Sequence, residues 1–98
     1  MEVRSKRGAL IRLTEERWNH IIDEHGELAE LRAEVLSTVS DPEKILAGNM
    51  GELLALRTFE PGKWLVVVYR EVEEDGFVIT AFLTRRFRSL DRRTQLWP

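Results

Sequence analysis

The spacing of apolar residues changes once along this 98-residue chain, near Gly51. Before that point apolar residues recur at helical intervals, and after it they form stretches rich in β-branched and aromatic residues. The turn sequences "EPGK" and "EEDG" separate these stretches, and connections this short join antiparallel neighbours. The second half of the chain is therefore predicted to be a three-stranded antiparallel meander over residues 52–59, 63–72 and 77–87.

The first half is predicted to be helical. Thr14 is a typical N-cap, and Gly26 is a residue type that often ends a helix in a left-handed conformation, so the first helix should cover residues 14–25. A second amphipathic helix should run over 27–39, and "SDPE" at 40–43 should open a short helical turn through Ile45 and Leu46.

These elements predict an α+β domain in which two N-terminal helices pack on a three- to four-stranded antiparallel sheet. The fourth strand, "ALIRL" at 9–13, would lie at an edge of the sheet. One domain should cover residues 1–98, with its core in 12–86 and a basic C-terminal tail at 87–98. The helices should cover one sheet face and leave the other partly open.

Composition narrows the class of protein. The chain has no cysteine, so a disulfide framework and a thiolate zinc site are excluded, and a cytoplasmic location is the simplest expectation. The longest apolar run, "WLVVVY" at 64–69, is too short to span a bilayer, and the polar N-terminus lacks the apolar core of a signal peptide. We therefore expect no membrane partner.

Charge is unevenly distributed around a net charge of −2. Residues 1–12 sum to +3 and residues 85–93 to +4, whereas the stretch between them sums to −9. An anionic partner such as RNA is compatible with this pattern only if basic segments gather in space. The alternative is that the basic segments are solvated ends that add solubility.

Both histidines lie in the segment "RWNHIIDEHG" at 17–26. At 100° per residue His25 falls on the apolar stripe of the first helix and His20 lies nearly opposite, so the two cannot share a metal ion. His25 is the stronger candidate for a site, because a helix end facing the fold holds an imidazole near the sheet edge. Alternatively, His25 is a packed residue and His20 an ordinary surface residue.

Polar residues interrupt the predicted strands. Strand alternation places Arg57 with Leu53 and Phe59, and Thr80 and Thr84 with Val78 and Phe82. Tyr69, the only tyrosine, shares a face with Leu65 and Val67. If these faces coincide, Arg57, Tyr69, Thr80 and Thr84 line one side of the sheet; otherwise they are ordinary half-buried positions, because sequence alone leaves the register open.

The element order, together with "WNHIIDEH", "ELLALR", "LVVVY" and "ITAFLT", resembles the barnase-EndoU-colicin-RelE-like (BECR) nuclease superfamily, and most closely its phage-associated PBECR branch. The resemblance covers about residues 12–86. It departs from that pattern where Gly26 follows His25, since proline often follows the histidine in that branch. The acidic middle of the chain is a second departure.

The resemblance implies a RelE-like fold and a small metal-independent ribonuclease, toxin-like in character, that needs no cofactor. The implied catalytic residues are His25 or His20, Arg57 and Thr80, with attack by the RNA 2′-hydroxyl on the adjacent phosphate. The implied substrate-binding residues are Tyr69, Thr84, Arg85, Arg86 and Arg88. RNA and an antitoxin or other protein would be the partners. The alternative is a non-catalytic protein-interaction domain of the same fold.

Overall fold

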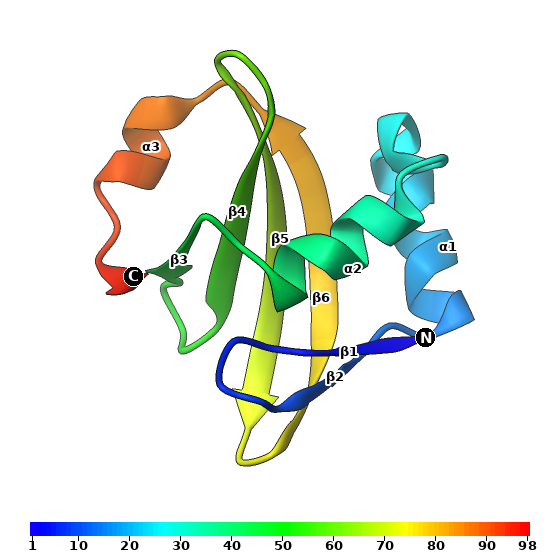
Figure 1. Ribbon diagram of the computed structural model, residues 1–98. Helices are drawn as coiled ribbons and strands as arrows, with labels where there is room; N and C mark the ends of the chain where they lie inside the picture. Colours follow the sequence, from blue (N-terminus) through cyan, green and yellow to red (C-terminus); the bar gives the residue numbers. More distant parts are fainter.

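The computed structural model describes the backbone of all 98 residues and every side chain except that of Phe87. The chain begins with a hairpin and two helices joined by a 3-10 turn, and continues into four strands, a short helix and a final strand (Figure 1). In order, the elements are β1 (Glu2–Arg4), β2 (Leu10–Arg12), α1 (Glu15–Glu24), η1 (Gly26–Leu28), α2 (Arg32–Ser40), β3 (Lys44–Ala47), β4 (Leu53–Glu60), β5 (Lys63–Val72), β6 (Asp75–Thr84), α3 (Phe87–Asp91) and β7 (Gln95–Trp97).

All seven strands form one sheet with the order β1-β2-β6-β5-β4-β3-β7. Every neighbouring pair is antiparallel except β2 and β6, which are parallel. The predicted fold class is therefore wrong: the protein is a seven-stranded mixed sheet with three helices. The meander of β4, β5 and β6 has the predicted antiparallel pairing, but it is only the centre of the sheet.

The strands that the sequence did not predict are short. β1 and β7 have three residues each and β3 has four, which is too short for a period of two to stand out. The segment expected to be a helical turn at 42–46 contains β3 instead, because pairing with β4 and β7 overrides the local helix-start pattern. Residues 87–98, expected as a tail, form α3 and β7, and β2 is not an edge strand because β1 pairs outside it.

The first helix runs between the predicted bounds, with Thr14 as its N-cap and His25 as its C-cap, but it does not end in the predicted way. The Thr14 side chain accepts a hydrogen bond from the Arg17 amide at 3.1 Å, as an N-cap should. Gly26 does not provide a left-handed stop, because the glycines with positive φ are Gly8, Gly51 and Gly62. The second predicted helix is also shortened, since residues 26–28 form a 3-10 turn and α2 starts only at Arg32.

Removing this cap should cost measurable stability. We expect Thr14→Ala to lower the free energy of unfolding by about 1 kcal/mol, because one amide at the start of α1 loses its acceptor. Thr94→Ala, at an exposed position before β7, is the matched control and should have little effect. Urea denaturation of the two variants checks this, and equal losses would show that the cap contributes nothing specific.

The two faces of the sheet have separate apolar clusters. α1 and α2 cover one face, where Trp18, Ile21 and Val35 of the helices are buried together with Ile11 of β2 and Val67 of β5. On the opposite face Leu90 of α3 packs with residues from β3, β4 and β5, namely Leu46, Leu54, Leu56 and Val66. α2 crosses in front of the strands in Figure 1, and α3 lies at the far side of the molecule from α1. No helix in the described residues has both the length and the apolar character needed to cross a membrane.

Candidate functional site

A β-bulge in β6 determines which predicted site residues share a face. Val68 of β5 pairs with Thr80, but the next residue, Tyr69, pairs with Val78, so Ile79 is an extra residue in β6. Side chains alternate along a strand, and one inserted residue reverses the faces on either side of it. Val78 therefore lies on the helix-covered face, whereas Thr80 and Thr84 lie on the face of α3.

Arg57 and Tyr69 lie on the helix-covered face, away from the two threonines. Arg57 pairs with Leu65, and it lines a hollow of about 290 Å³ that also contains Glu34 of α2. Arg57 is half-buried and makes no ion pair within the described residues. The structure therefore does not bring Arg57 and Tyr69 together with Thr80 and Thr84.

His25 does reach the side of the two threonines. Of the ten residues of β6, only residues 75–77 pair with β2. α1 also packs against β6. The His25 ring centroid lies 6.1 Å from that of Phe82, which packs with the apolar cluster under α3. Phe82 lies between Thr80 and Thr84 on the same strand face. The imidazole and the two hydroxyls are thus distributed around one aromatic ring.

A tryptophan extends this surface onto the next strand. Trp64 of β5 pairs with Thr84, is half-buried, and has Lys44 Nζ 5.4 Å from its ring centroid. We call His25, Trp64, Thr80, Phe82 and Thr84 the β6 face. All five are partly exposed, so the β6 face is accessible to a partner.

Arginines border the β6 face where β6 ends. The Arg86 amide donates a hydrogen bond to Thr84 Oγ1 at 3.0 Å, which fixes the chain as it leaves the strand. Arg85 Nη2 lies 3.5 Å from Glu60 Oε1. The side chains of Arg86 and Arg88 are exposed. Residues 15–40, which cover the other sheet face, hold seven of the seventeen acidic side chains and two arginines. This acidic segment therefore lies on the opposite side of the sheet from Arg86 and Arg88.

The β6 face has groups suited to recognising and cutting RNA. Histidine exchanges protons near neutral pH, and the His25 side chain is 32% exposed, with Nδ1 3.8 Å from Glu27 Oε1. Threonine hydroxyls can donate to phosphate oxygens, and aromatic rings stack on unpaired bases. Sequence analysis did not name Phe82 and Trp64 as site residues. The available signal was that Phe82 lies two residues from both Thr80 and Thr84 on the same strand. The described residues contain no group of three or more histidine or carboxylate side chains placed to hold a metal ion.

His20 is far more exposed than His25, as the helix geometry predicted. Its side chain is 66% exposed, and Nε2 lies 3.7 Å from Glu24 Oε1 on the next turn of α1. The hollow that it lines, of about 310 Å³, also includes Thr14 and Arg17, and none of the residues of the β6 face.

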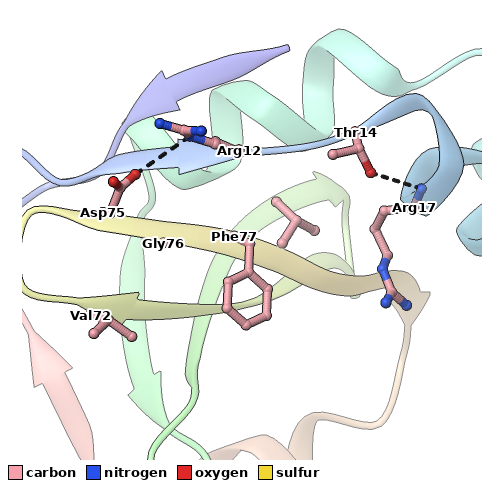
Figure 2. A pocket seen from close by; sticks show the side chains of 8 residues that line it. Arg12, Thr14, Arg17, Val72, Asp75, Gly76 and Phe77 are labelled. Atoms are coloured by element: carbon pink, nitrogen blue, oxygen red, sulfur yellow. Dashed lines mark hydrogen bonds and ion pairs between the residues drawn. The ribbon is translucent and has the colours of Figure 1, made fainter.

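A more voluminous hollow, of about 490 Å³, contains none of the predicted site residues. It lies where β2, β6 and the start of α1 meet, and Figure 2 shows Arg12 facing Asp75 and Thr14 linked to Arg17. Arg12 Nε is 3.5 Å from Asp75 Oδ1. Val72 and Phe77 are exposed here, at 59% and 48%. The hollow combines an apolar surface with arginines and is a second candidate for a binding site.

Comparison with known proteins finds no match, whether among protein-family models, curated proteins or solved structures. The resemblance to the BECR nucleases therefore stays a prediction, and the case for function depends on the geometry of the chain itself.

Proposed function

We propose that this protein is a cytoplasmic RNA-binding protein that cleaves RNA without a metal ion at the β6 face. The observation that carries the proposal is the contact between His25 and Phe82, with 6.1 Å between ring centroids. It brings the one half-buried histidine to the face that also holds Thr80 and Thr84, next to the arginines that follow β6. Arg57 supports no step in this proposal, because it lies on the opposite face.

The chemistry follows from the groups present. An unpaired base would stack on Phe82 or Trp64, and Arg86 and Arg88 would hold the phosphates on either side. His25 would take the proton of the 2′-hydroxyl as its oxygen attacks the adjacent phosphorus atom. The bond from phosphorus to the 5′-oxygen breaks, that oxygen takes up a proton, and a 2′,3′-cyclic phosphate remains. Thr80 and Thr84 would donate hydrogen bonds to the phosphoryl oxygens.

The basic border of the β6 face gives a direct test of RNA binding. We expect the double variant Arg86→Gln/Arg88→Gln to bind a single-stranded RNA more weakly. The slope of log K against log salt concentration should become shallower by about 1.4, because two phosphate contacts are lost. Arg4→Gln/Lys6→Gln removes the same charge from β1 and the turn that follows it, and is the matched control. Fluorescence anisotropy at several salt concentrations measures both. Equal weakening by the control pair would mean that binding is not localised at the β6 face.

The hollow in Figure 2 favours a second candidate function, protein binding. Its exposed Val72 and Phe77 suit an apolar side chain, and Arg12 and Arg17 suit flanking acidic residues, so the partner would be an acidic, partly apolar protein segment. If the wild type fails to bind RNA at low salt, and Phe77→Asp abolishes binding of an acidic partner protein, this second function replaces the first.

A further inference from the structure

The two edges of the sheet come close together over Tyr69. Lys6, in the turn between β1 and β2, has its Nζ 4.7 Å from the ring centroid of Trp97 in β7, the opposite edge strand. In the same turn, Arg7 pairs with Glu71 near the end of β5. The sheet therefore curls around its helix-covered face, and a cavity of about 290 Å³ lies between the turn, β5 and β7.

Tyr69 lines this cavity and has an unused hydrogen-bonding group. It is 0% exposed, and its hydroxyl oxygen has no hydrogen-bond partner among the described residues. Buried hydroxyls in proteins are normally paired, and leaving one unpaired is unfavourable. Burial, and to a lesser degree the charge of Glu71, raises the pKa of Tyr69 to about 12, so the phenol keeps its proton at neutral pH. The hydroxyl is thus a donor without an acceptor.

The remaining walls are mostly apolar. Ile45, Leu53, Leu96 and Trp97 line the cavity from β3, β4 and β7. The volume is well above the roughly 30 Å³ that one water molecule takes up in the liquid, and apolar walls offer water few partners. A small ring molecule fits this combination of size and surface better than isolated waters do.

The charges around the cavity cancel in pairs. Arg7 Nε and Nη2 both lie 3.0 Å from Glu71 Oε2, and Lys6 Nζ lies 3.9 Å from Asp41 Oδ1. A charged ligand would therefore meet no unpaired opposite charge. The Glu71 side chain is only 5% exposed, and both contacts of Arg7 are made to one oxygen, which leaves Oε1 able to accept another hydrogen bond.

We propose that this cavity binds an uncharged planar ring molecule that carries a carbonyl oxygen next to a ring N–H, the pattern found in uracil and hypoxanthine. The carbonyl oxygen accepts a hydrogen bond from the Tyr69 hydroxyl, the ring N–H donates one to Glu71, and Trp97 provides an aromatic wall. The site is independent of the proposed RNA surface, because Tyr69 lies on the helix-covered face of the sheet and the β6 face lies on the other.

Titration of the full chain with small probes tests this site. We expect uracil and hypoxanthine to give saturating NMR shifts for the amides of residues 6–7, 69–71 and 95–97. Tyr69→Phe should weaken binding about tenfold, because the acceptor on the ligand loses its donor. Its melting temperature should not fall, since the deleted hydroxyl had no partner. Leu53→Phe, which reduces the cavity volume, should weaken both probes. Benzoate, a charged ring, should bind at least about tenfold more weakly than uracil.

Three results would overturn the proposal. The first is that neither probe saturates the protein at its solubility limit. The second is that Tyr69→Phe binds uracil as tightly as the wild type does, and the third is that benzoate binds as tightly as uracil. None of these outcomes depends on whether the chain binds RNA.

Discussion

Gly76→Ala is expected to lower the free energy of unfolding by about 3 kcal/mol or more, enough to leave a small domain largely unfolded. Gly76 lies in β6, at the point where the parallel strand β2 joins the sheet. It pairs with Ile11 of β2. A Cβ atom at this position would overlap with the carbonyl oxygen of Arg70 and lie 2.7 Å from Cδ1 of Ile11. Neither neighbour can move easily, since Arg70 O is backbone and Ile11 is fully buried.

Gly26→Ala is the control for this prediction. No atom would lie within 4 Å of the added Cβ, and Gly26 does not have a positive φ, so the change should stay within about 0.5 kcal/mol of the wild type. Urea denaturation followed by circular dichroism measures both variants. If Gly76→Ala were as stable as Gly26→Ala, the close packing of Gly76 between Arg70 of β5 and Ile11 of β2 would be refuted.

His25→Ala is expected to reduce metal-free RNA cleavage by roughly 10² to 10⁴-fold, the usual contribution of a general acid or base. His20→Ala should leave the rate unchanged, because His20 projects from the exposed side of α1. A fluorescent mixed-sequence RNA in EDTA gives the rates. Thermal denaturation of each variant separates loss of chemistry from loss of folded protein.

The competing interpretation makes His25 a packing residue only. In that case His25→Ala would melt early while cleavage by its folded fraction persisted at the wild-type rate. The assignment of His25 to the reaction would then be wrong, whatever the RNA affinity.

Local signals predicted the elements that are long or clearly capped. Thr14 and the apolar stripe through Trp18 and Ile21 located α1, and the turn sequences at 60–63 and 73–76 located the hairpins that join β4, β5 and β6. These signals depend on residues close in sequence. β1, β3 and β7 are held in place by pairing with other strands. A strand of three or four residues shows too little alternation of apolar and polar residues to be predicted from the sequence.

At the candidate site, local sequence signals fail because of a single residue, Ile79. Alternation along an unbroken strand places Val78 and Thr80 on one face, and the extra residue Ile79 moves them to opposite faces. That single shift separates Arg57 and Tyr69 from the two threonines. The expectation that His25 approaches the sheet edge needed only the helix geometry, and its contact with Phe82 agrees with it.

The most direct test of the central claim is to incubate the purified wild-type protein with mixed-sequence RNA in EDTA and to analyse the ends of the products. The account predicts fragments that end in 2′,3′-cyclic phosphate, formed more slowly by Arg86→Gln/Arg88→Gln than by Arg4→Gln/Lys6→Gln. RNA that stays intact, together with no binding at low salt, would contradict the account.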